Sequence, residues 1–293
     1  MRIAVTGGSG RIGAYVVREL VARGHDVISI DRRHPAEPIA PAKFVFAQLS
    51  DRPHVQAVLE QVEAVCHLGE IPSVNAGQSP EETFAQNVHA GSVVMQTAAD
   101  LKLKRAIYTS SCQVYGFWDR ACATPLRLPF DEDHPLSPRN AYAMGKVAME
   151  MYSRMLAERQ GLSVAAFRFP WVRVEPADED AFDALRKKPQ RTDGFASYVH
   201  AEDVARGYAL AVEQSRPGFD AYHFSAAEVN SLHPLAGRLA EHHPEYPPLP
   251  ADWPAYKSPI LITKLREHFG WEPKWNALDF YRQKHGEPRP ATG

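Results

Sequence analysis

Tyr142 and Lys146 stand four positions apart and together could hold and move a proton. If the segment around them is helical, their side chains lie on one face of the helix. An ammonium beside a phenol stabilises the phenolate and lowers the pKa of the phenol from ~10 toward the neutral range. Tyr142 would then act as a general base on a substrate hydroxyl, or as a general acid in the reverse direction. The pair alone is also typical of an exposed helix face, so its meaning depends on the rest of the chain.

A glycine-rich segment at the start of the chain predicts a phosphate-binding turn. It reads Thr6-Gly7-Gly8-Ser9-Gly10-Arg11-Ile12-Gly13 and lies between an expected strand, Arg2–Thr6, and an expected helix, Arg11–Arg23. Glycines let the backbone approach a pyrophosphate, and a helix N-terminus supplies N–H groups and the positive end of its dipole. Asp31 ends the second expected strand 18 residues after Gly13, close to the spacing of a carboxylate that binds the adenosine ribose. The alternative, a tight turn without a ligand, is disfavoured by this context.

Short apolar runs alternate with helical patterns over about the first 170 residues, which is typical of a parallel α/β sheet. We therefore expect a Rossmann-type doubly wound parallel sheet with a small C-terminal substrate-capping region. Residues 1–170 and 197–225 are assigned to the dinucleotide-binding domain, and residues 171–196 and 226–293 to the small substrate-binding region. Two long helices are expected at Glu81–Leu103 and Ala141–Gln160, and a last helix at Ile260–Phe269.

Five motifs in order make the chain resemble the extended short-chain dehydrogenases/reductases, also called the NAD-dependent epimerase/dehydratase family. They are the turn at Thr6–Gly13, His67-Leu68-Gly69 after the fourth expected strand, Asn87 in a long helix, Ser110-Ser111-Cys112-Gln113-Val114-Tyr115-Gly116 after the fifth strand, and Tyr142-Ala143-Met144-Gly145-Lys146. The resemblance covers nearly the whole chain. It implies an NAD(P)-dependent enzyme in which the cofactor carries the hydride chemistry. It also implies a homodimer built from the two long helices.

The residues and the resemblance together assign a catalytic set. Tyr142 would be the acid/base, Ser111 would orient the reacting oxygen, and Lys146 would hold the nicotinamide ribose and support the phenolate. The residues expected to bind the cofactor are Gly7, Gly10, Arg11, Ile12, Gly13, Asp31, Arg32, Gln48, Leu49, Leu68, Gly69, Glu70, Asn87, Thr109, Ser110, Tyr142, Lys146, Phe169, Pro170 and Val172. The residues expected to contact the substrate are Ile71, Ser111, Cys112, Gln113 and Trp171.

Asp31 favours NAD over NADP, because a carboxylate at the ribose repels a 2′-phosphate. Arg32 and Arg33 follow it directly and could attract the same phosphate. Their alternative is a solvated loop without a ligand. The expected cofactor is therefore NAD, with NADP the less favoured choice.

Departures from the family pattern narrow the reaction. Cys112-Gln113 stands where members that dehydrate nucleotide sugars carry Asp-Glu, so dehydratase chemistry is disfavoured. Trp171 replaces the Asn, and Val174 the Gly, of a motif typical of members that bind nucleotide-diphospho-sugars. The segment from Pro176 to Tyr198 is also short for a nucleotide pocket. We therefore expect a smaller substrate, such as a free sugar, a sugar acid or a similar polyol. Trp171 either stacks on its ring face or closes the pocket wall.

Three functions are consistent with these residues. The leading one is hydride transfer at a secondary alcohol or ketone of a small sugar-like substrate. An epimerase of a free or nucleotide-linked sugar would use the same residues and keep NAD tightly bound. A non-catalytic NAD(P)-sensing regulatory protein would share the fold, but such proteins usually lack the pair formed here by Tyr142 and Lys146.

Composition argues against several other classes. The chain has 293 residues and a formal net charge of -2, which gives no reason to expect a nucleic acid or an anionic membrane as partner. Its three cysteines cannot form a disulfide framework, so we expect a reducing, cytoplasmic location. No apolar run approaches the ~20 residues of a membrane span. No metal-binding spacing is present, so no metal is expected.

Several polar segments are interpreted as structural. His67, at the end of the fourth expected strand, is taken as a core histidine with satisfied hydrogen bonds. Asp131-Glu132-Asp133 is interpreted as a solvated turn, and His242-His243, at a helix end, as surface residues. The segment Phe269-Gly270-Trp271-Glu272-Pro273 is expected to pack the last helix onto the small region.

Overall fold

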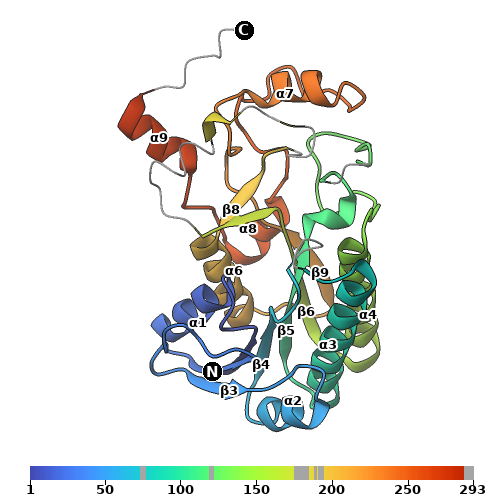
Figure 1. The fold of residues 1–293 in the computed structure, drawn as a ribbon, viewed down its shortest axis with the longest axis vertical. Helices are drawn as coiled ribbons and strands as arrows, with labels where there is room; N and C mark the ends of the chain where they lie inside the picture. The colour runs from blue at the N-terminus through green and yellow to red at the C-terminus, as the bar shows by residue number, and fades with distance from the viewer. Residues whose placement is uncertain (73–76, 119–121, 175–184, 188–189, 191–194, 287–293) are drawn as a thin grey trace.

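Seven parallel strands form the sheet on which the molecule is built (Figure 1). The computed structural model describes residues 1–72, 77–118, 122–174, 185–187, 190 and 195–286. Across the sheet the strands are β3 (Lys43–Phe46), β2 (Asp26–Asp31), β1 (Arg2–Thr6), β4 (Ala64–His67), β5 (Arg105–Ser111), β6 (Ser163–Phe169) and β9 (Phe219–His223). The expected doubly wound parallel sheet is confirmed, since every neighbouring pair is parallel. The strand order changes direction between β1 and β4, where folds of this kind bind ligands.

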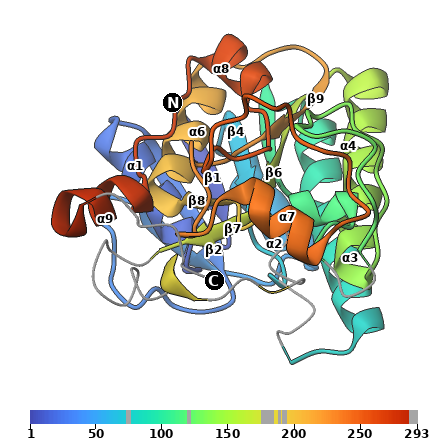
Figure 2. The same ribbon diagram turned by 90° about the horizontal axis from the view of Figure 1, so that it is seen from above.

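Helices cover both faces of the sheet (Figures 1 and 2). On one face lie α1 (Gly13–Ala22) and α6 (Ala201–Glu213), and on the other lie α2 (Arg52–Leu59), α3 (Pro80–Asp100) and α4 (Ala141–Gln160). Along β1, Ile3 and Val5 pack into the core with α1 and α6, whereas Ala4 packs into the core with the other three helices. This alternation is the two-residue period of a strand. Burial on both faces explains the continuous apolar runs of the sequence.

The two long helices begin at residues whose side chains satisfy the first backbone N–H groups. Ser79 caps α3 in a reciprocal capping box with Glu82, and Pro80 opens the helix, which begins one residue earlier than expected. The Asn140 side chain caps α4 by accepting a backbone N–H at 2.8 Å. The cap holds the first turn of α4, and this turn carries Tyr142.

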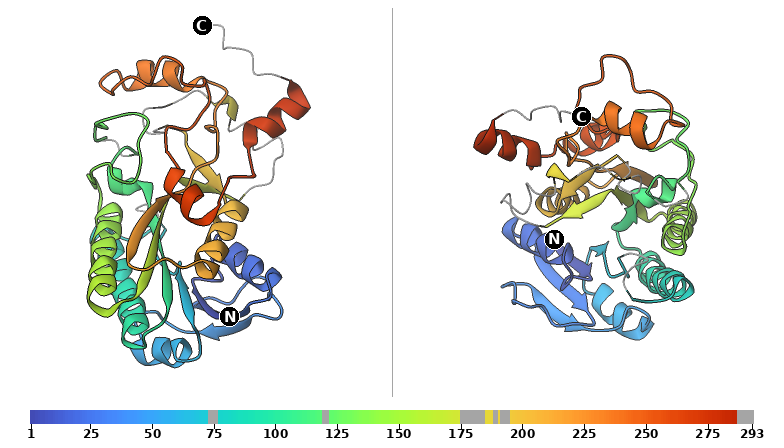
Figure 3. Two further views of the ribbon diagram at one scale, coloured as in Figure 1. Left: turned by 180° about the vertical axis from the view of Figure 1, so that it is seen from behind. Right: turned by 45° about the horizontal axis from the view of Figure 1, so that its top comes forward.

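The chain after residue 170 places β9 on the sheet and builds the part drawn above the sheet in Figure 1. Figure 3 shows this part from behind and tilted forward. Its further elements are β7 (Trp171–Arg173), β8 (Tyr198–His200), α7 (Leu235–His242), α8 (Thr263–Phe269) and α9 (Ala277–His285), and η1 (Cys112–Tyr115) follows β5. The strands β7 and β8 form a separate two-stranded parallel sheet. The helix α9 was not expected, so the prediction that the last helix lies at Ile260–Phe269 was wrong. Asn276 caps α9 with its side chain, a signal that was available in the sequence.

Two polar segments interpreted as exposed contain buried residues. Glu132 is 8% exposed and its Oε1 accepts the His223 backbone N–H at 2.7 Å, so the solvated-turn prediction was wrong for this residue. His243 is buried, with its ring stacked on that of Tyr246 at 4.3 Å between centroids, whereas His242 is half-buried. Glu132 is buried through a residue 91 positions away, which the neighbouring sequence does not reveal, whereas Tyr246 stands only three positions after His243.

Trp271 packs on the main core of the sheet and not on the small region. It is 1% exposed, its ring lies 4.8 Å from that of Phe224, and its indole N–H donates to the Asp203 carbonyl oxygen of α6 at 2.8 Å. The helix beside it, α8, contributes Leu265 and Phe269 to the same core. The expectation for this segment is corrected accordingly.

Candidate active site

One large cleft lies at the carboxyl ends of the sheet strands. Its volume is about 1110 Å³, above the ~300–1,000 Å³ of most single-ligand pockets, so it has room for a dinucleotide and a second small molecule. Every residue that sequence reasoning assigned to cofactor or substrate lines this cleft. The cleft therefore brings together the glycine turn, the ends of β4, β5 and β6, and the first turns of α4.

The glycine turn is shaped for close backbone approach. Gly7 has φ +70°, and a Cβ placed on it would lie 2.7 Å from the Gly69 Cα. A Cβ on Gly13 would lie 2.1 Å from the Gly7 carbonyl oxygen. Both positions therefore exclude any side chain, as a turn around a pyrophosphate requires. The helix α1 begins at Gly13, so its N-terminus opens on the cleft.

Asp31 ends β2 beside this turn. Its carboxylate accepts the backbone N–H of Ser9 at 3.1 Å and that of Arg33 at 3.0 Å. These two contacts aim the carboxylate at the rim of the cleft, which Arg32 and Arg33 also line. The geometry fits a ribose-binding carboxylate next to two cationic side chains.

The loop that follows β4 is held to the rest of the site at both ends. The Thr6 hydroxyl oxygen accepts the backbone N–H groups of Leu68 and Gly69, each at 3.2 Å. On α3, Asn87 accepts the Ile71 N–H at 2.7 Å and donates to the Ile71 carbonyl oxygen at 3.0 Å. Asn87 lines the cleft, but its amide is used to clamp this loop, so we expect it to serve the cofactor by positioning Glu70 and its neighbours.

Tyr142, Ser111 and Lys146 meet as the sequence predicts. Tyr142 is 8% exposed, and the Ser111 side chain lies beside its hydroxyl and favours the ionised form. The Lys146 ammonium lies 5.3 Å from the Tyr142 ring centroid and donates to the Thr109 carbonyl oxygen at 2.6 Å. A phenol, a hydroxyl and an ammonium therefore converge at one point of the cleft.

The acid/base balance of Tyr142 differs from the expectation. Burial raises the pKa of Tyr142 above its ordinary value, the Lys146 charge works in the opposite direction, and the Glu70 carboxylate adds to the rise. The predicted lowering was wrong for the protein without ligands, because sequence reasoning counted the ammonium and not the burial or the second charge. An oxidised nicotinamide adds a positive charge that favours the phenolate.

Glu70 forms an ion pair with Lys146 inside the site. The Lys146 and Glu70 side chains are 2% and 4% exposed. Burial acts to lower the pKa of Lys146, but the charge and hydrogen bond of Glu70, together with the neighbouring Tyr142 and Glu150, hold this pKa above its ordinary value. Sequence reasoning assigned Glu70 to the cofactor and missed this partnership.

Among the described residues, the substrate end of the cleft carries no acidic pair. Cys112 is buried, its thiol donates to the Arg168 carbonyl oxygen at 3.4 Å, and burial raises its pKa. Gln113 accepts the Asn140 side-chain N–H at 3.0 Å. Trp171 is half exposed at the rim, and the Arg173 guanidinium lies over its ring, 5.5 Å from the centroid. This arrangement supplies surface and hydrogen bonds rather than a second acid/base couple.

Several lining residues were not expected. They are Ser50, Pro72, Gln78, Gln86, His89, Ala90, Trp118 and Val174. Gln86, His89 and Ala90 lie at helical spacing beside Asn87, a signal that was available in the sequence. The segment between Pro176 and Tyr198, used above to judge substrate size, lies largely outside the described residues.

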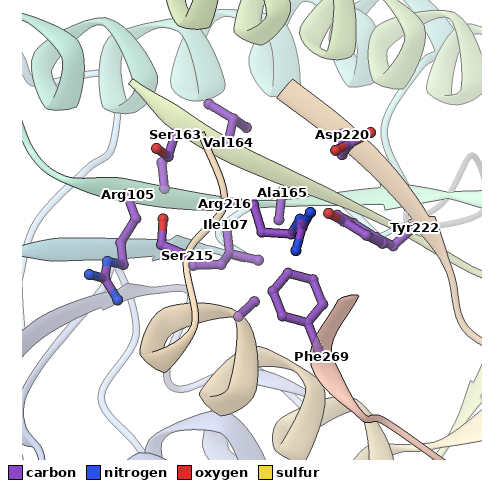
Figure 4. A pocket seen from close by; sticks show the side chains of 12 residues that line it. Arg105, Ile107, Ser163, Val164, Ala165, Ser215, Arg216, Asp220, Tyr222 and Phe269 are labelled. Atoms are coloured by element: carbon purple, nitrogen blue, oxygen red, sulfur yellow. The ribbon is translucent and has the colours of Figure 1, made fainter. Parts of the chain in front are cut away.

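A second pocket, at the opposite ends of β5, β6 and β9, is shown in Figure 4. Its volume is about 10 Å³, no more than a single water requires. Within the described ranges, no cluster of three or more His, Cys, Asp or Glu side chains could hold a metal ion. A search of the same ranges finds no helix with the length and apolar character needed to cross a bilayer.

The model of the NAD dependent epimerase/dehydratase family matches residues 3–173. The chain belongs to this family. A UDP-glucose 4-epimerase of Mycolicibacterium smegmatis is 29% identical over 97% of this chain and 99% of its own length. A UDP-glucose 4-epimerase of Lactobacillus helveticus is 31% identical over 58% of this chain, and this match spans about half (51%) of the relative.

Relatives with a different named activity are also similar. An L-arabinose 1-dehydrogenase (NAD(P)(+)) of Haloferax volcanii is 29% identical over 74% of this chain and 84% of its own length. Among solved structures, a UDP-glucose 4-epimerase of Thermotoga maritima, crystallised with UDP-glucose, superposes with a TM-score of 0.72 at 24% identity. The match covers 97% of this chain and 99% of that chain, and it shows the shared fold. The family is one of NAD-dependent enzymes, and it includes both epimerases and dehydrogenases.

Proposed function

We propose that this protein oxidises or reduces a small sugar or sugar acid at a secondary alcohol carbon, with NAD as the hydride carrier. The observation that carries this proposal is the convergence of Tyr142, Ser111 and Lys146 in the same cleft as the glycine turn and Asp31. NAD, when bound, accepts or donates the hydride. The side chains of this chain supply binding, orientation and the proton.

The roles follow from the contacts. In oxidation, Tyr142 takes the proton from the substrate hydroxyl. The carbon that bears this hydroxyl loses its hydride to the cofactor, so the alcohol becomes a carbonyl. Ser111, which lies beside Tyr142, orients the reacting oxygen. Lys146 offers its charge to the phenolate and a donor to the nicotinamide ribose. The glycine turn would hold the pyrophosphate, and the Asp31 carboxylate would hold the adenosine ribose.

A small substrate is supported by what stands at the far end of the cleft. Buried Cys112 and hydrogen-bonded Gln113 do not form the acid/base couple that removal of water needs. Trp171, half exposed at the rim of the cleft, offers aromatic surface that suits a sugar ring. These features favour simple hydride transfer over dehydration.

The test is a substrate panel. Purified protein is incubated with NAD and with free aldoses, sugar acids and nucleotide sugars, and NADH formation is followed. We expect turnover with a free sugar or sugar acid. Tyr142→Phe should lower kcat at least about 100-fold and change NAD affinity less than about twofold, because the hydroxyl serves the proton and not the dinucleotide. Full activity of this variant would remove Tyr142 as the acid/base.

Epimerisation is the second candidate, and the end-to-end similarity to UDP-glucose 4-epimerases favours it. An epimerase would retain NAD through purification and release no net NADH, while the sugar changes configuration. Product analysis by chromatography of the same panel separates the two activities. Tight NAD binding with no reaction across the panel would instead revive the non-catalytic sensor.

We also propose a homodimer that pairs α3 and α4 with their counterparts. Met144 and Met151 lie seven positions apart on α4, hence on one side of the helix, and are 47% and 68% exposed. Exposed apolar side chains on one helix face suit burial against a partner. For location we propose the cytoplasm, which the three free cysteines favour.

A further inference from the structure

Glu70 directs both oxygens of its carboxylate at neighbouring elements. One oxygen, Oε2, is paired with the Lys146 ammonium of α4. The other, Oε1, accepts the Tyr108 hydroxyl of β5 at 3.0 Å. A buried carboxylate is costly unless it is paired and hydrogen-bonded, and both conditions are met here.

The backbone on either side keeps Glu70 in this place. A Cβ on the preceding Gly69 would lie 2.2 Å from Leu49 Cδ1 and 3.1 Å from the Gly7 nitrogen, so the loop is pressed against the glycine turn. The following residue, Ile71, is clamped by two hydrogen bonds to Asn87. The carboxylate is thus held at the cleft by the same loop that fits the cofactor.

Glu70 supplies the negative charge that faces the catalytic pair. The other ionisable side chains that act on Tyr142 and Lys146 are His67 of β4, Tyr108 of β5 and Glu150 of α4. Burial lowers the pKa of His67 to about 4 and raises the pKa of Tyr108 well above its usual range, so both are neutral near pH 7. Glu150 is paired with Arg168 through hydrogen bonds of 2.6 and 3.0 Å.

We propose that Glu70 is a positioning residue that neutralises Lys146, keeps Tyr142 protonated, and thereby sets the pH range in which the enzyme works. The inference rests on the proposed function, in which Tyr142 exchanges the proton. A lone ammonium would favour the phenolate, whereas an ammonium paired with a carboxylate favours it much less. Oxidation needs the phenolate, so Glu70 moves the rise of the oxidative rate to higher pH. Reduction needs the phenol, so Glu70 extends the reductive range upward.

The test compares pH profiles of kcat for NAD-dependent oxidation. Glu70→Gln should move the rising limb to lower pH by about one unit, because the Lys146 charge is no longer cancelled. Glu70→Asp keeps the charge, so its rising limb should lie close to that of the wild type. Tyr108→Phe removes the contact to Oε1 without removing the charge, and should leave the limb in place.

A direct titration covers the case in which turnover is too weak to measure. The phenolate of Tyr142 is followed by ultraviolet difference absorbance between each protein and its Tyr142→Phe counterpart, with NAD present. The midpoint should be lower in the Glu70→Gln background. If no substrate turns over but this midpoint shifts, the proposed function fails and the electrostatic role of Glu70 stands.

Three results would overturn the inference. The first is that the pH limbs and the midpoints coincide for wild type and Glu70→Gln. The second is that Glu70→Gln lowers kcat uniformly across pH. The third is that Tyr108→Phe shifts the limb as much as Glu70→Gln does. If Glu70→Gln does not fold, Glu70→Asp decides the question. A pH limb unchanged to within ~0.2 unit supports the role of charge, and a limb displaced to lower pH contradicts it.

Discussion

His67 has its imidazole buried beneath the glycine turn, which is energetically unfavourable. It is fully buried, and its Nδ1 is hydrogen-bonded to the Thr6 hydroxyl at 2.7 Å. Its Nε2 has no hydrogen-bond partner among the described residues, so the expectation of a fully satisfied core histidine was only half right. Burial lowers the pKa of His67 to about 4 from 6.5. The ring therefore stays neutral in the folded protein.

This neutral ring makes stability fall in acid. The unfolded chain takes up a proton below pH ~6.5, whereas folded His67 does so only near its pKa of about 4. When the pH falls from 7 to 5, this residue should lower the free energy of unfolding by about 2 kcal/mol. In urea unfolding, the loss of unfolding free energy between pH 7 and pH 5 should be smaller by that amount in His67→Asn than in the wild type. The exposed His89, changed to Gln, serves as the control. Parallel pH dependences in wild type and His67→Asn would contradict this account.

We expect Asp31 to decide between NAD and NADP. Its carboxylate, held by the Ser9 and Arg33 N–H groups, would face a 2′-phosphate at the adenosine ribose. Asp31→Asn removes the repulsion and leaves Arg32 and Arg33 beside the phosphate. The ratio of kcat/KM for NADP to that for NAD should rise at least about tenfold, measured by initial rates. Arg32→Ala in the Asp31→Asn background should reverse part of the gain. An unchanged ratio would place the adenosine ribose elsewhere.

Residues whose role depends on local spacing could be predicted from the sequence. Gly7, Gly13 and Asp31 are required by one turn and the two strands beside it, so their spacing alone locates them. The pairing of Glu70 with Lys146 could not be predicted in this way. It depends on the register of β4 against β5 and on the first turns of α4, and the two residues are 76 positions apart.

At the scale of elements, α3 holds the loop after β4 through the Asn87 amide. Asn87 holds the loop after β4 by two hydrogen bonds to Ile71, and both residues are buried. Asn87→Ala leaves the Ile71 N–H and carbonyl without partners, which should cost about 1–3 kcal/mol of unfolding free energy. The KM for NAD should rise more than kcat falls, because the loop that borders the cofactor loosens. A destabilised variant with unchanged KM would show that the clamp serves folding alone.

Elements with strong local signals were predicted more closely than short ones. The strand β1 and the helices α3 and α4 carry clear periodicity and end signals, and their bounds agree with expectation or differ by a few residues. The strands β7 and β8 have three residues each and stabilise one another across 27 positions of sequence. Such strands have no periodicity of their own to read.

At the scale of the molecule, the proposed dimer gives a direct prediction. Met151, 68% exposed on α4, would lie in the interface, whereas Leu126, 70% exposed, lies on a loop outside the two long helices. Met151→Lys should shift the protein toward the monomer in light scattering, because an ammonium is then buried against an apolar partner. Leu126→Lys, the matched control, should leave the mass unchanged. Equal masses for wild type and both variants would exclude this face as the interface.

The order of strands also has a consequence for synthesis. β6 ends at Phe169 and its outer neighbour β9 begins at Phe219, so roughly 50 residues emerge from the ribosome between the two. During that interval β6 is an unpaired edge, and the sheet face that α6 later covers is bare. Open edges and uncovered apolar faces are the surfaces through which incomplete chains associate. We therefore expect the nascent protein to need chaperone protection most after β6 is made and before β9 is available to pair with it.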